Sequence, residues 1–221
     1  MPAFDRSRFA AIIPVSGAGN IAVADGKLWV LTGAGTVVRL DPATNRVVGK
    51  PLRVPADTAA IAVAQGALWV TTVASGDLGA PGKDTVARID LASGKVVADL
   101  PVSSEPHRVA YGAGAVWVGN WHDDSVSRID PATNQVVGSP IPIGAHHAGN
   151  LVVGAGDLWV TSDYRVDGAA EDTVVVRIDA QTNRAVETIA VGGHPIDVAA
   201  AGGAVWVSVA NPGRLLRIAG R

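Results

Sequence analysis

Hydrophobic and polar residues alternate in short runs along this chain, and the runs are separated by turns rich in glycine, proline and asparagine. Segments such as TVVRLD (residues 36–41) and SVSRID (residues 125–130) exchange apolar and polar positions with a period near two. That period is typical of a half-buried β-strand. No segment places its apolar residues at helical spacing. The pattern therefore predicts an all-β protein of short strands.

A tryptophan recurs along the chain at intervals of 40, 48, 42 and 47 residues. The five copies lie in the segments KLWV, ALWV, AVWV, DLWV and AVWV, as Trp29, Trp69, Trp117, Trp159 and Trp206. A glycine stands three residues before each of them, and an arginine follows downstream, as Arg39, Arg88, Arg128, Arg177 and Arg217. Five copies of a unit of about 40–50 residues with regular turn signals indicate a β-propeller.

Each unit resolves into four strands, A to D. The IAV-type segment is strand A, the Trp-containing segment is strand B, the alternating segment is strand C, and the VVG-type segment opens strand D. In the DPATN-type turn between C and D, Asp41 can accept backbone N–H groups and Pro42 presets φ. The residue at the left-handed position of this turn is Asn45, Gly94, Asn134 or Asn183. We expect four antiparallel strands per blade.

The fifth unit contains strands A to C and stops at residues 218–221, whereas an apolar segment at residues 9–15 precedes the first unit. We expect that segment to supply the missing strand, because an unpaired sheet edge would otherwise stay exposed. The prediction is one domain over residues 1–221, a five-bladed β-propeller whose last blade is closed by the N-terminal strand.

Residues that occur once in every blade are expected to have structural roles. The repeated tryptophan fits the core between blades, and the repeated arginine should bond within or between blades. Function is therefore sought among residues that occur in only one or two blades.

Those exceptions collect at one end of the predicted blades, where the B–C loops and the links between blades lie. From each tryptophan to its arginine the distances are 10, 19, 11, 18 and 11 residues, so the second and fourth B–C loops carry insertions. The histidines all fall at this end, as His107, His122, His146, His147 and His194.

Counting twelve residues back from each repeated tryptophan gives the entry to strand A, the strand nearest the central channel. These positions are Gly17, Asp57, Glu105, His147 and His194. His107 lies two residues after Glu105, and the period of a strand directs both side chains the same way. The third B–C loop, WVGNWHDD (residues 117–124), should rise beside them. We therefore predict a polar site over the channel mouth.

Imidazole and carboxylate groups suit a divalent metal such as Mg²⁺ or Zn²⁺, or acid–base chemistry near neutral pH. The candidate metal ligands are Glu105, His107, His147 and His194. The candidate catalytic residues are His107 and His122. The candidate ligand-binding residues are Trp121 and Tyr164 as aromatic walls, together with Asp57 and Lys83. The alternative is that these residues only solvate strand ends and set turns at a wet end of the propeller.

Composition excludes several classes of function. The net charge of −2 and pI near 6.2 give no electrostatic case for nucleic-acid binding. The absence of cysteine excludes disulfides and thiolate chemistry, and the apolar runs are too short to span a bilayer. No G-x-S-x-G motif occurs. We expect a monomer. A secreted or periplasmic location with a removed leader is compatible with the sequence, which does not decide the compartment.

The unit G-x-L-W-V followed by R-I-D-P-x-T-N-x-V-V resembles the repeats of the streptogramin (virginiamycin B) lyase-like and YVTN-type propellers over essentially the whole chain. The resemblance implies a site at the propeller mouth. The family lyase is a seven-bladed enzyme that opens the ester of a cyclic depsipeptide by elimination with Mg²⁺. Glu105 and His107 match its Glu-x-His pair, Asp57 stands where it has a histidine, and Trp121-His122 replaces its Glu-Lys pair.

Three functions remain open at this point. The first is a binding module for a small molecule, peptide or glycan at the channel mouth, with or without a divalent metal. The second is a metal-assisted lyase or hydrolase, in which His122 moves protons. The third is a scaffold whose irregular loops dock another protein, because a propeller fold alone does not specify function.

Overall fold

The computed structural model describes residues 11–55, 57–73, 84–144, 147–162, 174–210 and 213–219. These residues form strands and turns, without any helix among them. Accordingly, the described part of the chain offers no helix with the length and apolarity needed to cross a membrane. The chain separates into two compact units, Met1–Val54 and Pro55–Arg221.

The first unit is one antiparallel sheet. Its strands are β1 (Ala18–Ala24), β2 (Lys27–Thr32), β3 (Thr36–Asp41), β4 (Arg46–Val47) and β5 (Leu52–Arg53). The order is β1-β2-β3-β4, and β5 also pairs with β3. Strand D of this blade is thus split into β4 and β5. The split falls at Gly49, which has a φ of 74°, and at Pro51, which has no N–H for the ladder.

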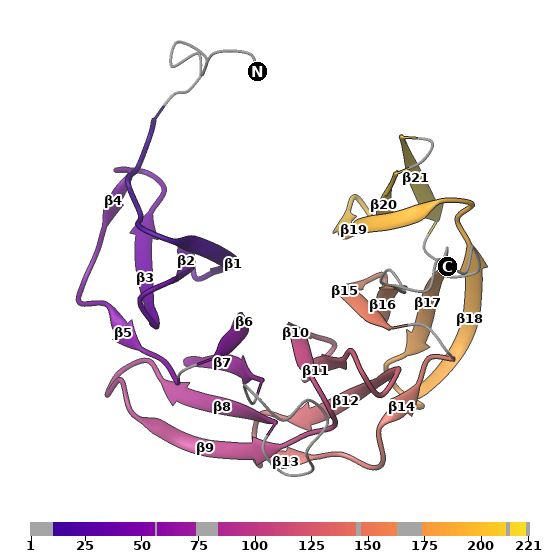
Figure 1. Ribbon diagram of the computed structural model, residues 1–221, viewed down its shortest axis with the longest axis horizontal. Coiled ribbons are helices and arrows are strands. Elements are labelled where there is room, and N and C mark those ends of the chain that lie inside the picture. Colours follow the sequence, from indigo (N-terminus) through magenta and orange to yellow (C-terminus); the bar gives the residue numbers. More distant parts are fainter. Residues whose placement is uncertain are drawn as a thin grey trace. The chain divides into compact units, whose positions relative to one another are not determined.

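The second unit contains four antiparallel sheets that follow one another along an arc (Figure 1). The first of these sheets consists of β6 (Thr58–Ala64), β7 (Ala67–Thr72), β8 (Thr85–Asp90) and β9 (Val96–Pro101). The second consists of β10 (Pro106–Gly112), β11 (Ala115–Asn120), β12 (Ser125–Asp130), β13 (Gln135–Val136) and β14 (Ile141–Pro142). The third sheet consists of β15 (Ala148–Gly154), β16 (Asp157–Ser162), β17 (Val174–Asp179) and β18 (Arg184–Ala190). The fourth consists of β19 (His194–Ala201), β20 (Ala204–Ala210) and β21 (Arg214–Ala219).

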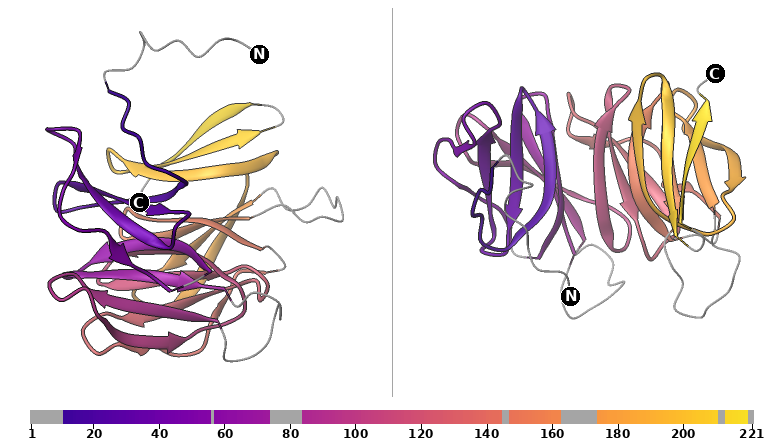
Figure 2. Two further views of the ribbon diagram at one scale, coloured as in Figure 1. Left: turned by 60° about the vertical axis from the view of Figure 1, so that its left-hand side comes forward. Right: turned by 90° about the horizontal axis from the view of Figure 1, so that it is seen from above.

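Four strands of the second unit line the inner side of its arc, namely β6, β10, β15 and β19 (Figure 1). Strand β10 packs between β6 and β15, and β15 packs against β19. Seen edge-on, the strands of this unit run between two opposite ends (Figure 2, right). The A–B and C–D turns therefore lie at one end, and the B–C loops and links between blades lie at the other, here called the B–C end.

The repeated tryptophan forms the core between blades, as predicted. Trp69 and Trp117 are fully buried, and Trp159 is 3% exposed. Trp69 clusters with Val116 and Val118 of the following blade, and Trp117 clusters with Leu158 of the blade after that. Trp69, Trp117 and Trp159 thus fill the space between their own sheet and the next.

The repeated arginine binds within its blade and across to the next blade. In register, Arg88 lies opposite Trp69, and its guanidinium carbon is 5.4 Å from the indole centroid. Its Nη1 donates to Pro131 O at 2.9 Å and to Asn134 Oδ1 at 2.6 Å, both in the C–D turn of the following blade. Arg128 makes the equivalent bonds to Ala180 O and Asn183 Oδ1. Arg88 and Arg128 therefore connect adjacent blades of the second unit.

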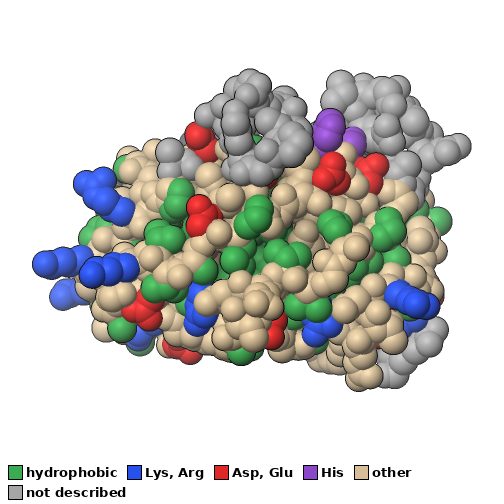
Figure 3. Space-filling view, turned by 90° about the horizontal axis from the view of Figure 1, so that it is seen from below, with side chains coloured by type: hydrophobic (Ala, Val, Ile, Leu, Met, Phe, Trp, Pro, Cys, Tyr) green, Lys and Arg blue, Asp and Glu red, His purple; other side chains and the backbone are tan. Residues whose placement is uncertain are grey.

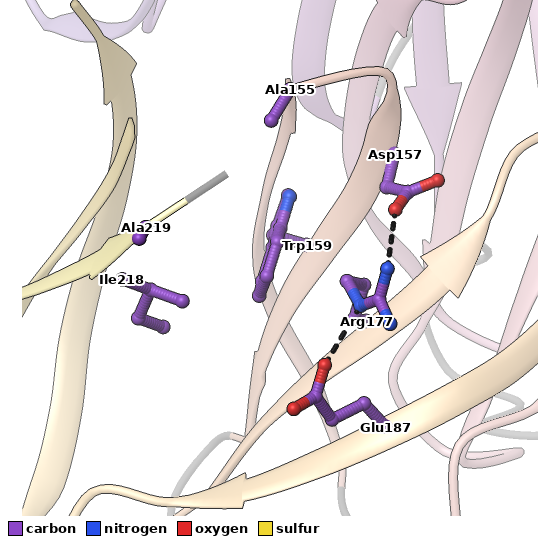
Figure 4. A pocket seen from close by; sticks show the side chains of 7 residues that line it. All are labelled: Ala155, Asp157, Trp159, Arg177, Glu187, Ile218 and Ala219. Carbon is purple, nitrogen blue, oxygen red and sulfur yellow. Dashed lines mark hydrogen bonds and ion pairs between the residues drawn. The ribbon is translucent and has the colours of Figure 1, made fainter. Parts of the chain in front are cut away.

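Arg177 departs from this arrangement. Its Nη1 donates to Asp157 Oδ2 at 2.8 Å and its Nε donates to Glu187 Oε2 at 2.9 Å, so both partners belong to its own blade (Figure 4). A cavity of about 120 Å³ lies beside this pair and is also lined by Trp159 and by Ile218 of β21.

The C–D turns have the predicted geometry. Asn45, Asn134 and Asn183 have φ values of 55°, 57° and 57°. The first aspartate of each turn accepts backbone hydrogen bonds, as Asp130 Oδ1 does from Ala132 N at 2.8 Å. This bond is the main cause of the lowered pKa of Asp130, and the bond from Thr182 N has the same effect on the pKa of Asp179.

The prediction of an all-β, five-bladed β-propeller is confirmed by these five sheets. Four strands per blade is approximate, because strand D is split in the first and third blades and the last sheet contains three strands among the described residues. Residues 11–15 of the expected N-terminal strand have no strand structure, and residues 9–10 lie outside the described residues. Closure of the last blade by this segment stays a prediction.

Candidate functional site

A β-bulge interrupts the start of every inner strand of the second unit. The register shifts between Thr58 and Ala60, Pro106 and Arg108, Ala148 and Leu151, and Pro195 and Asp197. In β10 the extra residue is His107. A bulge bends its strand and redirects a side chain, and bulges are frequent beside functional sites. This bulge places His107 and Arg108 side by side at the B–C end.

The position twelve residues before the repeated tryptophan has a backbone role. Asp57 and Glu105 have φ values of 61° and 55°. Their carbonyl oxygens accept from the residues that follow strand B, Val73 N at 3.2 Å and Trp121 N at 2.8 Å. In the first unit Gly17 has the same conformation. Glutamate is strained in this region of φ, and such strain is concentrated at functional sites.

Three rings from separate segments come together at the B–C end. Trp121 follows β11, and its ring centroid lies 6.0 Å from that of His107 and 4.0 Å from that of His147. The interplanar angles are 21° and 20°, so both pairs are stacked. We name the set Glu105, His107, Trp121, Asp124 and His147 the histidine cluster.

The imidazole of His147 is held in one orientation. Its Nδ1 lies 2.8 Å from Trp121 O and 2.9 Å from Asp124 Oδ1. A backbone carbonyl only accepts hydrogen bonds, so Nδ1 carries the hydrogen and donates it. The neutral ring then presents Nε2 as an acceptor. A carbonyl or carboxylate on one ring nitrogen is the arrangement that orients histidines in metal and acid–base sites.

Glu105 and His107 form the second polar pair of the cluster. The Nε2 atom of His107 lies 3.8 Å from Glu105 Oε2, and the imidazole is 40% exposed while the carboxylate side chain is 6% exposed. The two side chains therefore lie close together, but not through the period of a strand, because Glu105 precedes β10 and His107 is its bulge residue. The backbone of Glu105 is fixed by Asp84, whose Oδ2 accepts from Glu105 N at 2.7 Å. Asp84 is itself buried.

The other candidate residues lie outside the cluster. His122 is exposed on the turn after Trp121, and Asp57 is exposed at the start of the preceding blade. His194 lines a different cavity, between β15 and β19. Lys83 and Tyr164 lie outside the described residues. Across the ranges that the structure describes, no three His, Asp or Glu side chains converge in a group that could hold a metal ion.

A hydrogen-bonded chain across the inner strands was missed by the sequence analysis. Arg108 Nε donates to Asn150 Oδ1 at 2.7 Å, and Asn150 Nδ2 donates to Ile196 O at 2.8 Å. These bonds connect β10, β15 and β19. The signal was present nine residues before each tryptophan, where Asn20, Ala60, Arg108, Asn150 and Asp197 stand. Counting twelve residues back selected the bulge entry instead of this position.

Asn120 is a second missed residue. It ends β11, is fully buried and donates from Nδ2 to Ser125 Oγ and Ser127 Oγ, both at 3.0 Å. Its Oδ1 is also buried and has no hydrogen-bond partner within the described ranges. The residue at the same position of the second blade is Thr72. A side-chain amide at the end of strand B, where another blade has a threonine, was therefore the sequence signal that could have identified Asn120.

The histidine and acidic side chains of the B–C end are visible on the surface. In the space-filling view they gather along one edge (Figure 3). This edge is where the sequence pattern placed the residues that differ between blades.

Comparisons with known proteins support the fold and do not assign a family. No protein-family model matches the chain, and no curated protein matches it. A chain of the Kuenenia stuttgartiensis hydrazine synthase structure is similar, with a TM-score of 0.68 and 15% identity over 97% of this chain and 69% of that chain. A chain of the mitotic checkpoint complex crystal structure is similar with a TM-score of 0.70 and 12% identity.

The second of these matches covers 91% of this chain and 63% of the other, so this chain spans less than two thirds of its length. At such identities the likeness concerns the fold alone. The resemblance to the streptogramin lyase-like and YVTN-type repeats stays a prediction. What the comparisons and the five sheets establish together is a β-propeller.

Proposed function

We propose that this protein is a ligand-binding β-propeller whose site is the histidine cluster. The observation that carries the proposal is the orientation of His147, whose Nδ1 donates to Trp121 O at 2.8 Å, with Asp124 Oδ1 nearby at 2.9 Å, and whose ring is stacked on Trp121. A polar residue that only solvated a strand end would not need its ring fixed by both a hydrogen bond and a stacking contact. The ordered imidazole, together with the pair Glu105 and His107, suits a small molecule, peptide or glycan with polar groups.

The test is saturation-transfer NMR of the purified protein against three panels: mono- and disaccharides, short peptides, and cyclic depsipeptides. We expect at least one class to receive saturation from the wild type and to lose it with the variants His107→Ala and His147→Gln. Asp99→Asn, a change on the outer strand β9, is the matched control and should keep the signal. Transfer that is absent for all classes with the wild type, or that is as strong in both cluster variants as in the wild type, contradicts the proposal.

A divalent metal is a narrower version of this proposal. Glu105, His107 and His147 are the residues that would hold it, and the ion would have to draw them together, because they do not form such a group among the described residues. His194, the fourth ligand suggested by the sequence, lines a different cavity. Thermal unfolding of chelator-treated protein with Mg²⁺, Mn²⁺ or Zn²⁺ tests it, because an ion that binds the native state raises the melting temperature. The rise should disappear in His107→Ala and persist in Asp99→Asn. If none of the three ions changes the melting temperature, the protein does not bind a metal at this site.

A metal-assisted lyase resembling the streptogramin enzyme is the second candidate function. It is favoured by the Glu105–His107 pair, whose 3.8 Å separation suits proton transfer between a carboxylate and an imidazole through small movements. The assay is ring opening of a cyclic depsipeptide followed by liquid chromatography and fragmentation mass spectrometry, because elimination gives a linear isomer of unchanged mass, whereas hydrolysis adds one water. His122→Ala separates catalysis from binding: it should abolish turnover and keep binding if His122 moves protons. No ring opening by the metal-loaded wild type contradicts the lyase and leaves ligand binding intact.

A further inference from the structure

A second polar cavity lies between the inner strands of the last three blades, separate from the histidine cluster. Its volume is about 140 Å³. It is lined by Arg108 of β10, Asn150 of β15, Thr161 and Ser162 of β16, and His194 and Ile196 of β19. None of Glu105, Trp121 and His147 lines it, so it is not part of the site proposed above.

The described residues that line this cavity carry one permanent charge, the positive charge of Arg108. Among them there is no aspartate or glutamate. Within the described ranges, Arg108 takes part in no ion pair. The neighbouring acid of β19, Asp197, accepts from Val198 N at 2.8 Å and lines another cavity. Arg177, by contrast, is neutralised by two carboxylates. A half-buried guanidinium without a carboxylate partner favours an anionic ligand.

The guanidinium of Arg108 is held ready for such a ligand. Its Nε donates to Asn150 Oδ1 at 2.7 Å and its Nη1 donates to His107 O at 3.0 Å. A guanidinium has five N–H groups, so one on Nη1 and two on Nη2 remain. These two nitrogens form the planar fork that matches the two oxygens of a carboxylate or phosphate. The bonds already made to Asn150 and His107 hold the guanidinium in place, so little further ordering of the side chain is needed when an anion binds.

The hydroxyl groups of the cavity are committed elsewhere. Ser162 Oγ bonds to both the N–H and the carbonyl of Val174, each at 3.1 Å. Thr161 Oγ1 accepts from Asn150 N at 2.9 Å. Selectivity for an anion therefore rests on Arg108. Gly149 lets β15 approach β16 closely, since a Cβ there would lie 2.6 Å from Thr161 Oγ1.

We propose that this cavity binds a small oxyanion, a carboxylate or a phosphate group, through the fork of Arg108. The volume suits an ion of a few heavy atoms or the charged end of a larger ligand. The anion would bridge β10 to β15 and β19, at the point where Arg108 and Asn150 already connect the inner strands.

The test is an NMR titration of ¹⁵N-labelled protein that follows the Arg108 Nε–H and the Asn150 side-chain amide. Sodium acetate and inorganic phosphate are added in separate arms, with ionic strength held constant by chloride. We expect saturable shifts of both groups in at least one arm. Saturation with acetate indicates a carboxylate, and saturation with phosphate indicates a phosphate group.

Two variants localise the effect. Arg108→Lys keeps the charge and removes the fork, so binding should weaken on the order of tenfold or more, as expected for the loss of a charge-assisted bidentate bond. Arg184→Lys, on the exposed outer strand β18, is the matched control and should bind like the wild type. The saturation-transfer assay reports on the histidine cluster, so the two proposals can fail independently. Linear, non-saturating shifts in both arms, or equal saturation in Arg108→Lys, overturn the inference.

Discussion

Arg128 of one blade donates a hydrogen bond to the side-chain oxygen of Asn183 in the next. The same arginine lies opposite Trp117 in register, with its guanidinium carbon 5.2 Å from the indole centroid. One residue thus covers the buried tryptophan and connects two sheets. The Trp and Arg of the repeat therefore occur together, because the guanidinium packs on the indole ring of the residue opposite it.

Replacing Asn183 by glycine should lower the free energy of unfolding by about 1–3 kcal/mol, the range for a hydrogen bond to a charged donor. Glycine keeps the left-handed φ of 57°, so the change removes the amide without straining the turn. Asn45→Gly is the control, because Asn45 has a φ of 55° and no arginine is bonded to it among the described residues. Urea unfolding measures both. Equal losses in the two variants would show that the turn, and not the Arg128 bond, is responsible.

Glu105→Gly should be more stable than Glu105→Ala by about 1 kcal/mol, which reverses the usual order of alanine and glycine. Alanine would retain the strain of a φ of 55° without the carboxylate, whereas glycine adopts that φ freely. Denaturant midpoints of the two variants provide the measurement. Both changes should also remove ligand binding by the histidine cluster. A more stable alanine variant would mean that Glu105 is unstrained in solution.

Gly112→Ala should destabilise the second unit by about 1–3 kcal/mol through overpacking. An added Cβ at this end of β10 would lie 2.5 Å from the Cβ of Val153 on the neighbouring inner strand β15. Gly213→Ala is the matched control, since a Cβ there meets nothing within 4 Å. Thermal unfolding compares the pair. If Gly112→Ala and Gly213→Ala have the same melting temperature, the inner strands β10 and β15 are less closely packed than described.

Stability should decrease in acid because of the C–D turn aspartates. Hydrogen bonds hold the pKa of Asp41, Asp90, Asp130 and Asp179 below the ordinary value of 3.8. The native state therefore favours the ionised form. This contribution is complete above pH 3.8 and is lost as the pH falls through the lower pKa of the folded protein.

The measurement is the urea midpoint as a function of pH, for the wild type and for Asp130→Asn. The variant should be less stable near neutral pH, and its stability should fall less steeply in acid. Parallel curves for the two proteins would show that this carboxylate does not contribute.

Much of the fold followed from the repeat alone. Alternation with a period of two defined the strands, and the spacing of Trp29, Trp69, Trp117, Trp159 and Trp206 defined five units of one design. The left-handed positions of Asn134 and Asn183 were also predictable, because a turn places the same local demand on each copy. Splitting of strand D was readable in principle from the Gly-x-Pro segments of the first and third blades.

The candidate site was predictable only as a region. Sequence counting placed Glu105 and His107 together on the expectation that one strand contains both, whereas in the structure Glu105 precedes β10 and His107 is its bulge residue. It grouped His194 with them, whereas the structure places His194 beside Arg108 and Asn150.

Local patterns determined which residues form strands and turns, since those depend on neighbours a few positions apart. The stacking of Trp121 with His147, and the position of Arg108 in the second cavity beside Asn150 and His194, were decided by tertiary structure. Each depends on how the bulges redirect side chains and on how closely neighbouring inner strands pack. Neither quantity is encoded within a single repeat.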